Sequence, residues 1–120
     1  MNKKDHQLLP CQGKPNCVSS LATNKRHYIK PFSFSKHIEQ NIQQLCHLLA
    51  SLDGVTIQQQ DDIYIHAVCR SRVFGFKDDI EFLYDENTHV CNVRSASRLG
   101  YYDFGVNRRR VELVRKLFMK

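Results

Sequence analysis

The stretch DIEFLYDENTHVCNVRS, residues 79–95, decides the fold because polar and apolar side chains alternate on both sides of a short central segment. Apolar residues occupy positions 80, 82 and 84 before that segment and positions 91 and 93 after it. A period of two is typical of a β-strand that buries one face. Residues 86–89 are turn-prone, so the stretch predicts an antiparallel hairpin.

The charges of this hairpin also follow from the alternation. Any pairing that puts Phe82 on the face of Val93 also puts Arg94 across from Asp79 or Glu81. Opposite charges at facing positions stabilise a pair of strands. The hairpin therefore predicts a cross-strand ion pair.

Regular patterns continue on both sides of the hairpin. Residues 63–70 alternate as a further strand, and residues 55–59 are a candidate for a shorter fourth strand. Residues 35–52 carry apolar side chains at helical spacing, and residues 107–118 do so again. On the second helix Arg110 falls inside the apolar arc, so its side chain must either extend to solvent or meet a buried acid.

The first 34 residues have neither periodicity and are rich in turn-forming residues. The order of elements predicts an α+β fold, with an antiparallel sheet of three to four strands and two helices on one face. We expect an irregular N-terminal arm over residues 1–34 and one domain over residues 35–120, since 120 residues suit a single core.

The composition is that of an ordinary globular protein, with 42% hydrophobic and 25% charged residues. No apolar run is long enough for a membrane span or for the core of a signal peptide. We therefore expect a cytoplasmic location, with the envelope as the alternative if the N-terminus is incomplete.

The positive charge is concentrated at one end of the sequence. Residues 94–120 contain eight lysines and arginines against two acids, whereas residues 1–93 contain ten of each, so the whole net charge of +6 lies in the last 27 residues. Such a balance permits an anionic partner. Nucleic acid is not the expected partner, because no known nucleic-acid-binding module is present.

The stretch RSASRLGYYDFGVNRRR, residues 94–110, combines these charges with a glycine-bearing loop and a helix start. Free backbone N–H groups ringed by guanidinium groups suit a phosphate or a carboxylate. The first hypothesis is therefore a non-catalytic binding module for an anionic small molecule or an anionic group on a partner. Its predicted ligand-binding residues are Arg98, Tyr101, Asn107, Arg108, Arg109 and Arg72.

Two other hypotheses use the same charged residues. In the second, a structural or protein-interaction domain is held together by ion pairs among Arg70, Arg94, Arg110, Asp78, Asp79, Glu81 and Asp103. In the third, the carboxylates of Asp78, Asp79 and Glu81 perform acid–base catalysis. No nucleophile motif surrounds the serines, so no catalytic residue is assigned, and no cofactor is expected.

Cys11, Cys17 and His27 lie in the polar arm and are the only candidates for a metal site. Five residues between the cysteines do not match the common zinc spacings, so we assign no metal. An oxidising compartment favours a disulfide between Cys11 and Cys17, and a reducing one favours two free thiols. The other three cysteines fall on predicted apolar faces.

Three parts of the chain resemble a known family. The arm reads CQGKPNCVSS at 11–20 and HYIKPFSF at 27–34, the middle reads RSRVFGFKDDIEF at 70–82, and the end reads VRSASRLGYYDFGVNRRRVE at 93–112. These motifs are similar to those of the uncharacterised family catalogued as domain of unknown function 1499, found in many bacteria and in plastid-bearing eukaryotes. The resemblance spans nearly the whole chain and implies no reaction.

The chain departs from that family in two respects. Gln12 and Lys14 stand where the family usually has Pro and Ser. Family members often begin with a signal, lipoprotein or membrane segment, and no such segment is expected here. Because of these segments in the family, the resemblance supports an envelope location as the alternative to the cytoplasm.

Overall fold

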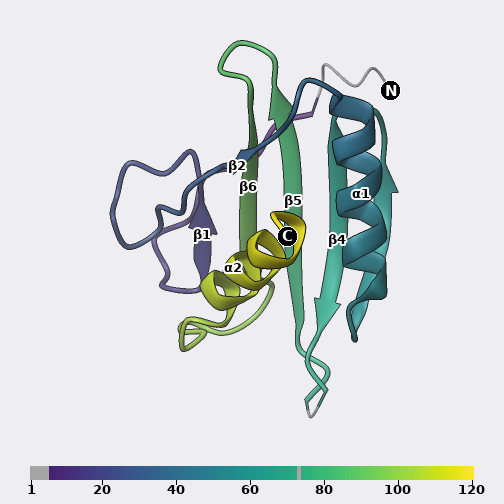
Figure 1. The fold of residues 1–120 in the computed structure, drawn as a ribbon. Coiled ribbons are helices and arrows are strands. Elements are labelled where there is room, and N and C mark those ends of the chain that lie inside the picture. Colours follow the sequence, from purple (N-terminus) through teal and green to yellow (C-terminus); the bar gives the residue numbers. More distant parts are fainter. Residues whose placement is uncertain (1–5, 73) are drawn as a thin grey trace.

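The computed structural model describes residues 6–72 and 74–120, so residues 1–5 of the predicted arm lie outside it. The described residues form two helices and a six-stranded, predominantly antiparallel sheet (Figure 1). In chain order the elements are β1 (Cys17–Ser19), β2 (Phe32–Ser33), α1 (Ile38–Ser51), β3 (Val55–Gln60), β4 (Tyr64–Arg70), β5 (Lys77–Asp85), β6 (Val90–Ser97) and α2 (Val106–Phe118).

The sheet has more strands than the three to four that the sequence predicts. Its order is β1-β6-β5-β4-β3, and β2 also pairs with β6. The two additional strands are β1 and β2, which come from the arm and contain three and two residues. Strands this short show no periodicity, and they form because β6 would otherwise be an open edge with unpaired backbone groups.

The hairpin predicted over residues 79–95 is formed by β5 and β6. Its register pairs Phe82 with Val93, and it pairs Glu81 with Arg94. Alternate residues of β5 are buried, beginning with Asp78 and continuing through Ile80. This alternation sends the side chains of Asp78 and Asp79 to opposite faces of the sheet.

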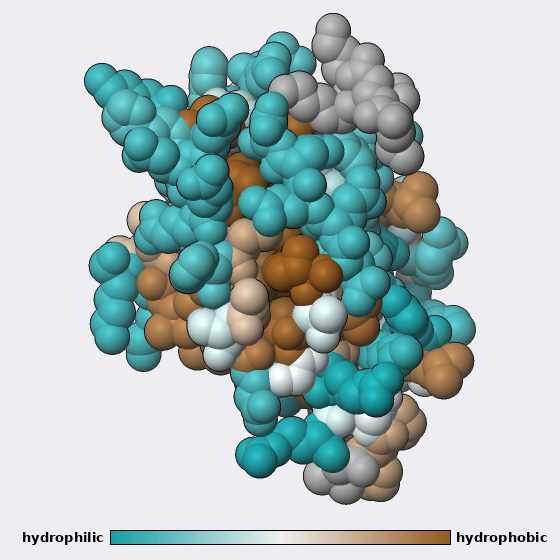
Figure 2. Space-filling model, turned by 90° about the vertical axis from the view of Figure 1, so that its right-hand side faces the viewer, coloured by the Kyte–Doolittle hydropathy of each residue, from teal (hydrophilic) through white to brown (hydrophobic). Residues whose placement is uncertain are grey.

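Both helices lie on one face of the sheet, as the sequence predicts (Figure 1). A single hydrophobic cluster joins Leu45 and Leu49 of α1 to Val114 of α2 and to Phe82 in the sheet. Figure 2 views the edge formed by α1 and β3, where apolar side chains gather in the middle between hydrophilic ones. Within the described residues, neither helix has the length and apolar character that crossing a bilayer requires.

The turn from α1 to β3 needs a glycine. Gly54 has a φ of +78°, and a Cβ at this position would lie 2.6 Å from the backbone oxygen of Arg70. The backbone N–H of Arg70 donates to the Gly54 oxygen at 2.8 Å. Close approach of these two backbones fixes where β4 ends and the following loop begins.

Near its start, at His6, the arm lies on the sheet face that carries no helix. The ring of His6 stacks on Tyr64 with centroids 3.9 Å apart, and its Nε2 lies 2.5 Å from Asp61 Oδ2. Leu8 is buried in the same segment. Farther along, a disulfide joins Cys11 to Cys17 of β1, so residues 6–17 are attached to the sheet at both ends.

Candidate functional site

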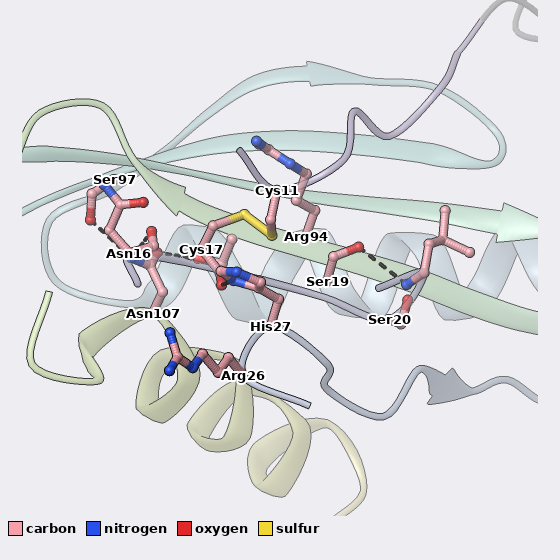
Figure 3. Close-up of a disulfide and its surroundings, with 12 residues drawn as sticks. Cys11, Asn16, Cys17, Ser19, Ser20, Arg26, His27, Arg94, Ser97 and Asn107 are labelled. Atoms are coloured by element: carbon pink, nitrogen blue, oxygen red, sulfur yellow. Dashed lines mark hydrogen bonds between the residues drawn. A yellow bond between two sulfur atoms is a disulfide. The ribbon is translucent and has the colours of Figure 1, made fainter. Parts of the chain in front are cut away.

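The start of α2 is built around Asn107, whose side chain is completely buried. Its Nδ2 donates to Ser97 Oγ (2.9 Å), Asp103 Oδ2 (2.8 Å) and the Asn16 backbone oxygen (3.2 Å). Its Oδ1 accepts from Ser95 Oγ at 2.6 Å. Figure 3 shows Asn107 directed toward Asn16 and Ser97. The structure therefore uses this predicted ligand-binding residue to join the arm, β6 and α2.

Asp103 caps the helix in place of an external anion. Its two carboxylate oxygens accept from the backbone N–H groups of Gly105 (2.8 Å) and Asn107 (3.0 Å). Burial acts to raise the pKa of Asp103, but hydrogen bonds from Asn107 and Gly105 outweigh it and hold the pKa below its ordinary value. The first turn of α2 is thus already occupied by a negative charge of the chain itself.

The predicted ligand-binding arginines do not converge on one point. Arg98 forms a bidentate pair with Asp79, with Nε–Oδ2 of 2.9 Å and Nη2–Oδ1 of 3.0 Å. Arg72 lies in the β4–β5 loop, 3.5 Å from Asp53, with both side chains more than four-fifths exposed. Arg109 Nη1 donates to the Phe104 backbone oxygen at 2.7 Å.

Arg108 is differently placed. Its Nη2 donates to the backbone oxygen of Arg26 at 3.1 Å. Both arginines line a hollow of about 210 Å³ between the arm and the start of α2, together with Tyr102. Arg26 comes from the arm, whose sequence shows no periodicity, and it was not among the predicted ligand-binding residues.

The face opposite the helices carries a row of ion pairs and hydrogen bonds. Asp79 accepts from Arg98 and also lies 2.7 Å from Nε2 of His66. The hydrogen bond from Arg98 is the main cause that lowers the pKa of Asp79, with burial acting against it. Glu81 lies 3.8 Å from Arg94 Nη1 and accepts a hydrogen bond from the Tyr64 hydroxyl. Burial, reinforced by Glu81, raises the pKa of Tyr64.

On the helix side Arg110 reaches Asp78, with 2.7 Å between Nη1 and Oδ2. Arg70 is exposed and lies opposite Lys77, and no acid in the described part of the chain lies within ion-pair distance of it. The three carboxylates considered for catalysis are therefore divided, with Asp78 under α2 and the other two on the far face. They do not share one site.

The arm holds Cys11 and Cys17 as a disulfide, so neither sulfur is a free thiolate (Figure 3). His27 is buried, and its Nδ1 lies 2.9 Å from the backbone oxygen of Cys17. No cluster of three or more histidine, cysteine, aspartate or glutamate side chains within residues 6–72 and 74–120 is arranged to hold a metal ion. Here the arm is a structural element of the sheet edge.

Sequence reasoning singled out only Tyr101, as a ligand-binding residue, from a further surface at the end of the sheet where the β4–β5 and β6–α2 loops lie. Its large apolar side chains are each more than half exposed: Phe74 (74%), Phe76 (58%), Leu99 (79%), Tyr101 (67%), Tyr102 (57%) and Phe104 (73%). Figure 2 shows apolar atoms projecting at the end of the molecule where the β4–β5 loop lies. The signal in the sequence was the presence of several apolar residues in two glycine-containing loops.

Comparison with known proteins gives one family. A search of curated proteins finds no match to the chain. The model of a family described as "Protein of unknown function (DUF1499)" matches residues 7–118, which include β1, β2 and both helices. A match over nearly the whole sequence shows that the chain belongs to the DUF1499 family.

Proposed function

We propose that the chain is a non-catalytic binding module for an anionic group, which it takes in the hollow between the arm and the start of α2. The observation that carries this proposal is that Arg26, Arg108 and Tyr102 line the hollow together. Guanidinium groups form charge-assisted hydrogen bonds to phosphate and carboxylate oxygens. An aromatic ring beside them shields such contacts from water and so strengthens them.

The charge balance of the hollow supports an anionic occupant. Asp103 also lines it, but its carboxylate oxygens accept hydrogen bonds from Gly105 and Asn107 and serve the start of α2. Arg108 places only its Nη2 on the Arg26 backbone oxygen, and a guanidinium has further N–H donors. The two arginines therefore supply the positive charge that faces an incoming group.

The distribution of carboxylates favours binding over acid–base catalysis. Catalytic pairs need two titratable groups in one pocket with pKa values driven apart. Here Asp78 pairs with Arg110 on one face, and Asp79 pairs with Arg98 on the other. Arg98 lowers the pKa of Asp79 and so favours its ionised state, and both pairings are those expected of groups that stabilise a fold.

The test is an NMR titration of the ¹⁵N-labelled chain with glycerol phosphate, using glycerol as the uncharged control. We expect glycerol phosphate alone to shift amide resonances around the hollow, at residues 16–18, 26 and 102–108. The double variant Arg26→Gln/Arg108→Gln should lose these shifts, because it removes both cations.

A matched variant, Lys36→Gln, removes an exposed cation next to α1, which begins at the opposite end of the sheet (Figure 1). It should keep the shifts. Thermal melting of each variant checks that the fold is intact. The proposal is wrong if glycerol phosphate shifts no resonance of the hollow, or if the folded double variant responds like the wild type.

A further inference from the structure

Two loops present large apolar side chains at the same end of the sheet. Because β5 pairs with β6, the loop that precedes β5 and the loop that follows β6 leave the sheet beside each other. The backbone N–H of Arg98 donates to the Lys77 oxygen at 3.0 Å, which holds the bases of the two loops together. Figure 1 shows both loops at the end where β4 finishes.

The exposed side chains on these loops form two apolar clusters at the same end of the sheet, one on each loop, which we together call the loop surface. Its residues are Phe74, Phe76, Leu99, Tyr101, Tyr102 and Phe104. Phe74 and Phe76 stack with centroids 5.4 Å apart, and Tyr102 lies 4.7 Å from Phe104. Monomeric proteins seldom leave so many neighbouring aromatic rings in water unless the patch contacts a partner or a membrane.

Part of the backbone of both loops is paired within the protein. In the β4–β5 loop, Ser71 exchanges backbone hydrogen bonds with Phe76 (2.9 Å) and Gly75 (3.1 Å), and its Oγ accepts from the Phe76 N–H (3.0 Å). In the β6–α2 loop, Asp103 accepts from the N–H groups of Gly105 and Val106. Paired backbone groups lower the cost of moving a loop tip out of water.

The charges beside the loop surface are mainly positive. The cations at this end include Arg70, Arg72, Lys77, Arg98, Arg108 and Arg109. The neighbouring acids already have partners, since Asp79 binds Arg98, Asp53 lies near Arg72 and Asp103 caps α2. An apolar surface bordered by cations is complementary to a partner that has an apolar interior and an anionic surface.

We propose that the loop surface docks onto a bilayer that contains anionic phospholipids. Phenylalanine and leucine at the loop tips enter the boundary between headgroups and acyl chains, tyrosines lie at headgroup level, and the arginines contact phosphates. The inference rests on the proposed function in one respect, because the Arg26–Arg108 hollow receives a headgroup phosphate.

The arrangement favours a bilayer over a protein partner. The apolar side chains project from two loop tips and are 57–79% exposed. Protein hot spots instead cluster in well-packed and desolvated pockets. A bilayer does not require a complementary shape. It requires apolar side chains at the loop tips and cations behind them, and the loop surface has this arrangement.

The experiment measures binding of the full chain to large vesicles by co-sedimentation. Vesicles of phosphatidylcholine alone are compared with vesicles of phosphatidylcholine and phosphatidylglycerol in equal parts. We expect binding to the anionic vesicles, weakened when salt shortens the screening length from about 10 Å to about 3 Å. Replacing Phe74 and Phe104 by Ser should lower the partition coefficient about tenfold or more, because both rings leave water on docking.

Two further variants distinguish binding through the loop surface from non-specific binding to vesicles. Leu113→Ser removes an exposed apolar side chain of α2, 48% exposed, and should leave vesicle binding unchanged. The chain contains no tryptophan, so Phe104→Trp provides a single fluorophore. Its emission should shift to the blue with anionic vesicles, as expected when the ring enters an apolar medium.

The outcomes distinguish this inference from the proposed function. Phe74→Ser/Phe104→Ser should still bind glycerol phosphate, whereas Arg26→Gln/Arg108→Gln should lose it. If the wild type binds glycerol phosphate but no vesicle, the bilayer inference is wrong, the proposed function stands, and an anionic protein becomes the partner to seek. If vesicles bind equally well to the Phe74→Ser/Phe104→Ser variant, the loop surface is not the docking site.

Discussion

Arg110 of α2 and Asp78 of β5 form an ion pair that connects the helix layer to the sheet, with 2.7 Å between Nη1 and Oδ2. Both side chains are largely buried, with exposures of 19% and 10%. The carboxylate faces the helices because alternate residues of β5 do so, and the arginine lies within the apolar arc of its helix. Each of these two charges is therefore stable at the helix–sheet interface only because the other is present.

Arg110→Ala should destabilise the protein by about 2 kcal/mol, because it leaves the carboxylate of Asp78 without its cation; a fully buried pair would lose more. Urea unfolding at pH 7 measures the change. Lys116→Ala, on the exposed side of the same helix, should change stability little. Equal effects of the two substitutions would show that the pair contributes no net stability.

Asp103→Asn should make stability depend less on pH in the acid range. The pKa of Asp103 lies below its ordinary value of 3.8 in the folded protein, so ionisation stabilises the fold above that pH. Wild type should exceed the variant at pH 7, and the difference should shrink as pH falls through the folded pKa. Thermal melting between pH 7 and pH 2 follows this convergence, with the exposed Glu86→Gln as the control.

Loss of the Cys11–Cys17 disulfide should cost about 2 kcal/mol, since it closes a short loop and limits the unfolded chain. The variant Cys11→Ser/Cys17→Ser and the reduced wild type should have the same unfolding midpoint. A reductant should have no further effect on the variant. If it lowers the midpoint of the variant as well, the reductant acts elsewhere in the protein.

The three remaining cysteines, Cys46, Cys69 and Cys91, should react with a maleimide only when the protein unfolds. All three are buried. Burial raises the pKa of Cys46 to about 11, so its thiol is almost fully protonated at pH 8. Mass spectrometry should find three labels in denaturant and none after brief native exposure. Rapid native labelling of Cys91 would contradict its buried position in β6.

The regular elements of the core were predictable because their periodicity is local. The hairpin appears as β5 and β6, and the helix predicted over residues 107–118 begins one residue earlier, at Val106. Strands β1 and β2 were not predictable, because five residues carry no pattern and their pairing depends on β6. A short strand formed at an edge is determined by its partner more than by its own sequence.

The residue types of the candidate site were predictable from the sequence, but the directions in which their side chains point were not. The sequence shows that residues 94–110 are rich in arginine, yet it cannot show that Asn107 points inward or that Arg98 returns to Asp79. Arg26 joins Arg108 only because the arm packs against α2. The sequence shows that the two loops contain aromatic residues, but it does not show that their side chains are exposed to solvent, because exposure depends on the folded structure.

The β6–α2 loop is restrained before it meets any partner. Asn16 Nδ2 donates to the Gly100 oxygen at 2.7 Å, and the Asp103 N–H donates to the Pro15 oxygen at 3.4 Å. The disulfide at Cys17 follows Asn16 directly and holds this part of the arm in place. The loop therefore loses less conformational entropy on docking than a free segment of its length, and a cross-link in the arm serves as the preorganising element for apolar side chains more than 80 residues away in sequence.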